Sequence, residues 1–287
     1  MANTIASYTD NQIMKALLTH DFSSIGREFV DDVISAIKHG AFAEAQNLDK
    51  VSLPAVKEVH AYAFQNAAIG EIDLSWEEIE AIGFSAFAGA SGYPMNLVLS
   101  KLTALSVGAF AGTSSAKNTN LRTISLPLWT GSAFSEGNGF SNGNTGIFAY
   151  CSAMTSFNAP ELQSVPYQML YYCQALEEVV LPKVSNVNGG AFNYCTNLKK
   201  IDLGGAITKF STAFMSYSNN VTALILRGVT SVPTISSTTF SNTPVKNGTC
   251  YVYVPKSLED TFKVASYWSN YASMIRAIED YPDICGS

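Results

Sequence analysis

The sequence has few charges, no basic run and no long apolar stretch, and each absence excludes a class of function. Charged residues make up 14% of the 287 residues, and the net charge is -6. Nucleic-acid binding needs a concentrated basic face, which this composition does not provide. No segment approaches the roughly 20 consecutive apolar residues of a membrane-spanning helix. Because 47% of the residues are hydrophobic, disorder is also excluded. We expect a folded protein that neither binds nucleic acid nor inserts into a membrane.

Signs of catalysis or metal binding are equally scarce. The chain has three histidines and no H-E-x-x-H sequence. His39 and His60 fall near equivalent corners of neighbouring repeats, but a metal pair there would need further ligands. Carboxylate doublets such as Glu177-Glu178 point to opposite faces of a strand, so they are poorly placed for general acid–base work in one cleft. We predict a protein that is not an enzyme, with no catalytic, cofactor-binding or metal-binding residues.

The five cysteines are too few and too regularly spaced for a disulfide framework. An odd number cannot pair completely. Cys151, Cys173 and Cys195 are separated by 22 and 22 residues, and zinc sites usually contain tighter C-x-x-C pairs, which are missing. We predict a ladder of buried free thiols about 5 Å apart; metal or disulfide chemistry is the alternative.

What the sequence does contain is a 22-residue repeat, clearest between Met154 and Leu198. Each copy begins L-x-x-V-x-L, often followed by Pro, and continues with a second apolar pair spaced by three. A fixed period of this length is typical of a solenoid, in which each turn covers the apolar face of the next. A phenylalanine closes each turn, with Leu170 substituting once, and we expect these rings to stack inside the coil: Phe42, Phe64, Phe87, Phe110, Phe148, Phe192, Phe214 and Phe240.

The alternation in V-x-L predicts short parallel strands with two apolar residues inward and one residue outward. The regions expected are an N-terminal cap segment at 1–28, a solenoid of about nine repeats at 29–247, and a C-terminal cap at 248–287. The N-terminal segment could instead be a helix that docks to a partner. In the C-terminal cap we predict a strand at 251–254, a helix at 257–264 and a second helix after Ser266, with apolar residues at helical spacing: Trp268, Tyr271, Met274, Ile275 and Ile278.

The units A-F-x-x-C-x-x-L-x-x-V-x-L-P-x-V-x-x-V resemble the BspA-type leucine-rich repeats common in gut bacteria. The segments 253–258, 267–272 and 275–282 resemble the C-terminal cap of such proteins in gut Firmicutes and their prophages. The resemblance implies an α/β leucine-rich-repeat solenoid, right-handed, with short parallel β-strands stacked turn on turn and a helical C-terminal cap. It also implies a surface adhesin or a host- or matrix-binding protein.

Two surfaces are candidates for partner binding. One is an insertion at 129–147, which holds five glycines and the aromatic residues Trp129, Phe134 and Phe140. Loops that leave a rigid scaffold often carry binding residues, although the two phenylalanines could instead pack back onto the coil. The other is the outward side of the strands, and the residues chosen there are Arg122, Asn158, Glu178 and Lys200. Their mixed polar character favours a protein or glycan partner on a host or bacterial surface.

We therefore expect a non-enzymatic adhesion or binding protein that faces the cell exterior. The first ten residues have no basic or apolar region of a secretory signal. Either a leader was removed or the protein reaches its destination by another route, which favours the alternative of a structural or host-recognition component of a phage particle.

Overall fold

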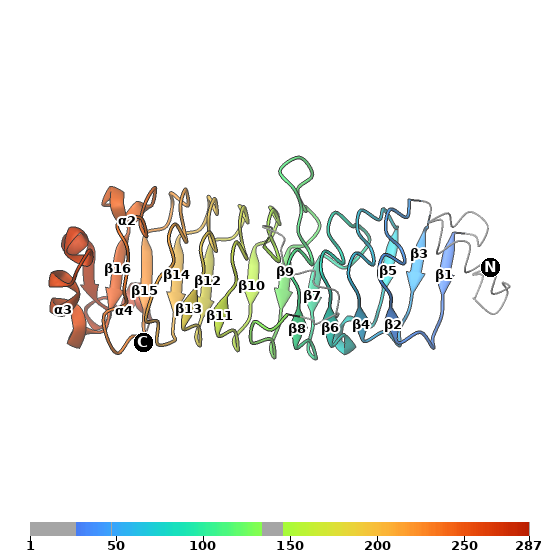
Figure 1. The fold of residues 1–287 in the computed structure, drawn as a ribbon, viewed down its shortest axis with the longest axis horizontal. Coiled ribbons are helices and arrows are strands. Elements are labelled where there is room, and N and C mark those ends of the chain that lie inside the picture. The colour runs from blue at the N-terminus through green and yellow to red at the C-terminus, as the bar shows by residue number, and fades with distance from the viewer. Residues whose placement is uncertain (1–26, 47, 134–145, 287) are drawn as a thin grey trace.

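The computed structural model describes residues 27–46, 48–133 and 146–286 and shows one elongated solenoid (Figure 1). Successive turns follow one another along the long axis, from β1 (Glu28–Val30) near the N-terminal end to β16 (Tyr251–Val254) near the other. The strand pairings within the described residues are parallel. The predicted solenoid of short parallel strands is confirmed.

The first wall of the coil is formed by the V-x-L segments. In each pair the inward residues lie opposite each other, as Val179, Ile201 and Leu224 do, so apolar side chains meet turn after turn. In chain order these strands are β1, β3 (Lys50–Ser52), β5 (Glu71–Asp73), β7 (Asn96–Val98), β9 (Thr123–Ser125), β10 (Ser156–Asn158), β12 (Glu178–Leu181), β14 (Lys200–Leu203), β15 (Ala223–Leu226), β16 and β17 (Ile275–Ala277).

The second wall comes from the apolar pair spaced by three, which runs the chain back as predicted. Its strands have only two residues each and also pair in parallel. They are β2 (Ala36–Ile37), β4 (Glu58–Val59), β6 (Ala81–Ile82), β8 (Ala104–Leu105), β11 (Ser164–Val165) and β13 (Asn186–Val187). A 3-10 turn, η3 (Trp76–Glu78), accommodates the longer repeat before β6.

Five of the eight closing phenylalanines form the predicted stack, whereas Phe214 and Phe240 meet edge-on with ring planes 64° apart. Ring centroids of Phe42, Phe64, Phe87, Phe110 and Phe148 are separated by 5.1, 5.1, 5.3 and 5.9 Å, with planes within 11° of parallel. All five rings are buried. Each spacing is close to the distance between neighbouring parallel strands, roughly 4.8 Å, so the stack follows directly from the repeat.

The three regularly spaced cysteines are buried free thiols, which confirms the first of the two expectations. Each Sγ donates a hydrogen bond to a backbone carbonyl of an earlier turn: Cys151 to Phe110 at 3.3 Å, Cys173 to Phe148 at 3.3 Å and Cys195 to Leu170 at 3.0 Å. Burial raises the pKa of the Cys195 thiol to about 12. These groups are therefore neutral and poorly nucleophilic at physiological pH.

The C-terminal cap is partly as predicted. Strand β16 occupies the predicted residues, and the first helix is present as η4 (Lys256–Leu258) and α3 (Glu259–Val264). Trp268 packs the C-terminal cap against the last turn. Its ring centroid lies 5.5 Å from that of Phe240 and 4.9 Å from that of Phe262, and its Nε1 donates a hydrogen bond to Pro233 O at 2.7 Å.

The second predicted helix was wrong in its extent. Residues Trp268–Met274 form the 3-10 segment η5, interrupted at Tyr271, and Ile275 begins strand β17, which pairs with β16. A helix over these residues would leave the backbone of β16 without a partner on that edge, and sheet edges are usually paired or covered. The chain then forms η6 (Ile278–Asp280) and α4 (Pro282–Cys285). A short helix before β16, α2 (Pro244–Asn247), was not predicted; Thr243 caps it and Gly248 ends it.

Candidate functional site

We call the outward side of the first wall the strand face. Along each strand, two outward residues alternate with buried ones, so the face consists of two parallel rows. Together with Arg122 at the edge where β9 begins, the rows contain Glu28, Val30, Lys50, Ser52, Glu71, Asp73, Asn96, Val98, Thr123, Ser125, Ser156, Asn158, Glu178, Val180, Lys200 and Asp202.

Side chains at paired positions of the strand face contact each other between turns. In the N-terminal part Lys50 Nζ lies 2.9 Å from Glu71 Oε1, and Ser52 Oγ donates to Asp73 at 3.1 Å. Towards the C-terminal end, Lys200 Nζ lies 2.6 Å from Glu178 Oε1. Lys50 and Lys200 each pair with one carboxylate of a neighbouring strand, so both ends of the face carry charged side chains joined by ion pairs.

The outward residues in the middle of the face are uncharged, and we call them the neutral stretch: Asn96, Val98, Thr123, Ser125, Ser156, Asn158 and Val180. Thr123 Oγ1 donates to Asn96 Oδ1 at 2.9 Å, and Asn158 Nδ2 donates to Ser125 Oγ at 3.0 Å. Val98 and Val180 are 48% and 47% exposed at its two ends. Hydroxyl and amide groups held in place between exposed apolar groups can form both hydrogen bonds and apolar contacts with a partner.

The structure brings together some of the residues predicted from the sequence. Asn158, Glu178 and Lys200 lie on the strand face, and Glu178 pairs with Lys200 in register. Arg122 is exposed at the edge of the face, and its guanidinium makes no ion pair with the described residues. Phe134 and Phe140 lie outside the described residues.

The prediction that Trp129 contacts a partner was wrong, because the residue is not exposed. Its side chain is fully buried, and its Nε1 donates to Ser132 O at 2.9 Å. A tryptophan beside a glycine-rich insertion can lie either in the loop or in the core, and the sequence does not distinguish the two. Here the ring fills the coil, so Trp129 does not belong to the contact surface.

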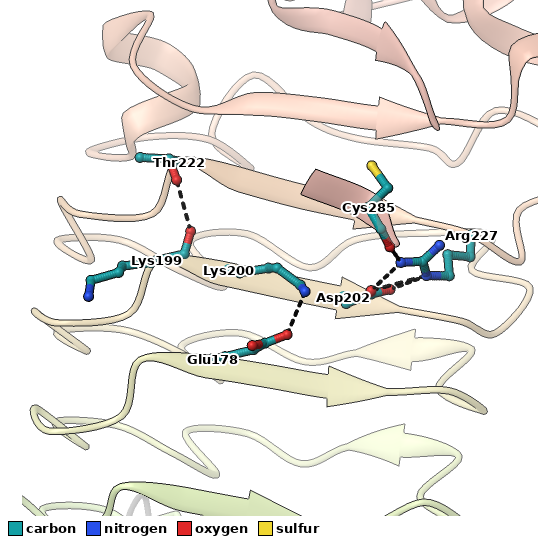
Figure 2. Close-up of polar contacts among 7 residues, drawn as sticks. All are labelled: Glu178, Lys199, Lys200, Asp202, Thr222, Arg227 and Cys285. Carbon is teal, nitrogen blue, oxygen red and sulfur yellow. Dashed lines mark hydrogen bonds and ion pairs between the residues drawn. The ribbon is translucent and has the colours of Figure 1, made fainter. Parts of the chain in front are cut away.

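The face is closed at its C-terminal end by the last residues of the chain (Figure 2). Arg227 Nε donates to both carboxylate oxygens of Asp202, at 2.9 and 3.0 Å, while Nη2 donates to Asp202 Oδ2 at 2.8 Å and also contacts the Cys285 carbonyl. The Asp202 side chain is 5% exposed. Asp202 lies at an outward position of β14, yet it is buried, because the C-terminal residues around Cys285 fold over it.

A row of tyrosines on another side of the coil was missed. Tyr150, Tyr172, Tyr194 and Tyr217 stack with ring centroids 5.0, 4.5 and 4.7 Å apart. All four have left-handed backbone conformations, with φ between 59° and 62°. The signal was available, since these residues recur at intervals of 22, 22 and 23. Their faces cover one another, so the row presents ring edges and hydroxyls to solvent.

Tyr171 packs edge-on against this row, with its centroid 5.4 Å from Tyr150 and 5.5 Å from Tyr194. Loss of hydration raises the pKa of Tyr171 to about 12, and the neighbouring phenols contribute in the same direction. Lys117 Nζ lies 6.0 Å from the centre of the Tyr172 ring, within the range of a cation–π contact.

No constellation for catalysis or metal binding is found in the part of the chain that the structure describes. No group of three or more His, Cys, Asp and Glu side chains there could hold a metal ion. One Gly-x-Ser-x-Gly sequence occurs at 139–143, outside the described residues; in hydrolases this motif joins a strand to a helix. Within the described residues, no helix has the length and apolar character to cross a bilayer.

The repeats match a known family. Residues 22–138 and 143–265 match the model of the BspA type leucine-rich repeat region, in six copies. The chain belongs to the BspA-type leucine-rich-repeat family. These BspA-type turns share one pattern, with apolar residues inward and residues of differing chemistry from turn to turn on the strand face. A search of curated proteins found no match.

A solved structure is similar to this BspA-type chain in fold. It is the crystal structure of the pneumococcal vaccine antigen PcpA, with a TM-score of 0.50 and 14% sequence identity; the alignment covers 88% of this chain and 66% of the PcpA chain. At this identity the likeness concerns the fold alone. The BspA-type chain spans about two thirds of the PcpA structure.

Proposed function

We propose that the protein is a non-enzymatic recognition protein that binds a protein or glycan of a host or bacterial surface, and that the neutral stretch of the strand face makes the contact. Its working location would be the cell surface, the extracellular medium or a phage particle. The observation that carries the proposal is the contrast along one face. The ends carry charged side chains, some of them joined by ion pairs, or are covered by α4, whereas the middle exposes Val98 and Val180 beside ordered hydroxyl and amide groups.

The physical argument rests on preorganisation. Side chains on stacked strands cannot move far relative to each other, because every turn is fixed by its neighbours through backbone hydrogen bonds. A partner that binds along such a face orders few additional groups, so less free energy is lost on association. Solenoids commonly bind extended partners in this way. Membership of a repeat family used as a binding scaffold also supports a recognition role.

The gut-bacterial origin and the prophage connection stay expectations from the sequence resemblance. A role in virion assembly would depend on the segment 1–28, of which residues 1–26 lie outside the described part. The strand face is the better supported site, since its geometry can be tested directly.

The test compares two chemically matched substitutions on different walls. Ser125 on the strand face accepts a hydrogen bond from Asn158 at 3.0 Å, and Ser164 on the second wall accepts one from Asn186 at 3.1 Å. Ser125→Glu and Ser164→Glu therefore disturb equivalent ladders by the same charge and volume. The labelled protein would be applied to a glycan array and to bacterial and epithelial cells, with binding measured by fluorescence.

We expect the unmodified protein to bind saturably and Ser125→Glu to reduce that binding at least tenfold, while Ser164→Glu leaves it within about twofold. Equal loss in both variants would indicate a structural effect and would contradict the assignment to the strand face. Absence of saturable binding by the unmodified protein to every surface tested would contradict the proposed function.

A further inference from the structure

A pocket of about 460 Å³ lies at the C-terminal end of the strand face, beyond the neutral stretch. Its size is in the range of small-molecule sites. The side chains that matter for its chemistry are Thr222, Thr249, Tyr251, Arg276, Tyr281 and Ile284.

The pocket exists because the chain folds back. Tyr253, on the outward row of β16, is 2% exposed and forms part of the lining with Ala223. Tyr281 packs edge-on against Tyr253, with ring centroids 5.5 Å apart. Arg227 contacts the Cys285 carbonyl and so fixes α4 (Figure 2). The neighbouring Ile284 lines the pocket. The lining is thus supported by packed and hydrogen-bonded groups.

Arg276 is the one charged residue of this lining. Its guanidinium lies 4.5 Å from the centre of the Tyr251 ring, and its Nη1 donates to the carbonyls of Ser273 at 2.9 Å and Ile275 at 2.8 Å. Those bonds hold the group in place. Its Nε and Nη2 donate to no atom of the described residues, and no carboxylate of the described chain lies within ion-pair distance.

A guanidinium with the Nε and Nη2 edge available is suited to a carboxylate, which it can bind through two parallel hydrogen bonds. The nearest acidic residues that follow in the chain are engaged elsewhere: Glu279 accepts from the Lys256 amide at 2.9 Å, and Asp280 pairs with Lys256 Nζ at 2.5 Å. The charge of Arg276 is therefore left for an anionic ligand.

The rest of the lining narrows the ligand further. Thr222 and Thr249 contribute hydroxyls whose internal hydrogen bonds are long, 3.3 Å to Lys199 O and 3.4 Å to Pro244 O. Tyr251 and Tyr281 add phenol groups and ring surface. Several hydroxyls and aromatic edges around one cation fit a ring that carries hydroxyls and one carboxylate. A free carboxylate side chain of a peptide would use the arginine and leave these hydroxyls without partners.

We infer that this pocket binds an acidic sugar, with Arg276 receiving its carboxylate and Thr222 and Thr249 contacting its hydroxyls. The inference deepens the proposed function and rests on it in one respect, that this face of the solenoid meets a glycan-bearing partner. It also names a second region of the face, which different substitutions can test.

The experiment is a titration of the full chain by isothermal calorimetry and saturation-transfer NMR. The probes are N-acetylneuraminic acid and glucuronic acid, with glucose as the neutral sugar and acetyl-glutamate amide as the acidic peptide group. We expect saturable binding of at least one acidic sugar, and binding of glucose and of the glutamate derivative at least tenfold weaker. Arg276→Gln should weaken the acidic sugar at least tenfold.

Arg276 also donates hydrogen bonds to two backbone carbonyls, so its substitution could weaken binding by disturbing the fold. A second variant controls for this effect. Thr249→Val removes a hydroxyl with little change in volume and should weaken the acidic sugar severalfold. Ser164→Glu, on the second wall, should leave this affinity unchanged. The cell and glycan-array binding of the same Arg276→Gln and Thr249→Val proteins separates failure here from failure of the proposed function. The inference is overturned if neither acidic sugar binds, if glucose or the glutamate derivative binds equally well, or if folded Arg276→Gln and Thr249→Val both bind as the unmodified protein does.

Discussion

Tyr172 and Tyr194 are 22 residues apart in sequence, yet their rings stack with centroids 4.5 Å apart and planes 18° from parallel. The same interval relates Cys173 to Cys195 inside the coil and Glu178 to Lys200 on the strand face. One repeat length therefore orders three chemically different ladders, one inside the coil and two on its surface. Because each ladder adds contacts only between neighbouring turns, its effects should be local and open to single substitutions.

Ring stacking offsets the cost of the left-handed backbone conformation at Tyr194. Its φ of 59° is left-handed, which costs a non-glycine residue roughly 1–2 kcal/mol, while stacking against a neighbour contributes about 0.5–1.5 kcal/mol. Tyr194→Ala loses both neighbours and keeps the strain; Tyr194→Gly loses them and relieves it. We expect urea unfolding to show that Ala is the more destabilising of the two by about 1 kcal/mol. Equal midpoints would mean that the strain is not present in solution.

The protein should become less stable above about pH 10, and Tyr171 should contribute to the loss. Its pKa is raised to about 12 in the folded chain, against roughly 10 in an unfolded chain. Between these values the unfolded state releases a proton that the folded state retains, so the free energy of unfolding falls as pH rises. Melting temperatures measured from pH 9 to 11.5 should fall less steeply for Tyr171→Phe. An identical slope in both proteins would show that Tyr171 titrates normally.

The buried thiols should not react with alkylating reagents in the folded protein. Cys151, Cys173 and Cys195 are fully buried and donate to backbone carbonyls, and burial raises the pKa of each thiol. Alkylation by iodoacetamide at pH 8, followed by mass spectrometry, should leave these three unmodified in buffer and modify all three in 6 M guanidinium chloride. Rapid labelling of Cys173 in buffer would mean that the central turns open readily.

The sequence pattern predicted the interior of the molecule better than its exterior. Apolar residues such as Phe64 and Val179 recur because every turn must fill the same space, so their period reports their burial. Outward positions are under no such constraint. The alternation therefore gives the outward direction of Asp202 but not its burial, which depends on the C-terminal residues around Cys285.

Ambiguous apolar residues account for the remaining errors. Ile275 and Ile278 fit helical spacing, but pairing with the open edge of β16 placed Ile275 in a strand. The tyrosine row was not predicted, because the repeat was defined by its inward apolar residues and these tyrosines lie at turns. Tyr150 and Tyr172 nevertheless share the repeat period. For the candidate site, the sequence correctly placed Asn158, Glu178 and Lys200 on the outward side of the strands, and their part in binding stays a prediction. It could not indicate the pocket beside Arg276, which is formed where the non-repeating C-terminal residues meet Thr222 and Ala223 of the last repeat.

Two ion pairs on neighbouring strands allow a comparison that measures how much the C-terminal residues 278–286 add to the stability of the fold (Figure 2). Asp202 is buried and is held by Arg227, whereas Glu178 is half exposed and pairs with Lys200. Removing one partner of a buried pair leaves an uncompensated charge and costs about 3–5 kcal/mol, while exposed pairs contribute less than about 1 kcal/mol. Asp202→Asn retains the volume but weakens the attraction that fixes Arg227. Since Arg227 is 34% exposed, we expect a loss of about 2 kcal/mol, against less than about 0.5 kcal/mol for Glu178→Gln.

The location of the effect is as informative as its size. In hydrogen-exchange mass spectrometry, Asp202→Asn should increase exchange in residues 278–286 at least tenfold, because Arg227 joins Asp202 to the Cys285 carbonyl. Exchange in the phenylalanine stack between Phe42 and Phe110 should not change, since those turns contact only their neighbours. Uniformly faster exchange along the whole solenoid would show that the tail stabilises the coil globally, and unchanged exchange at 278–286 would show that Arg227 does not hold the tail.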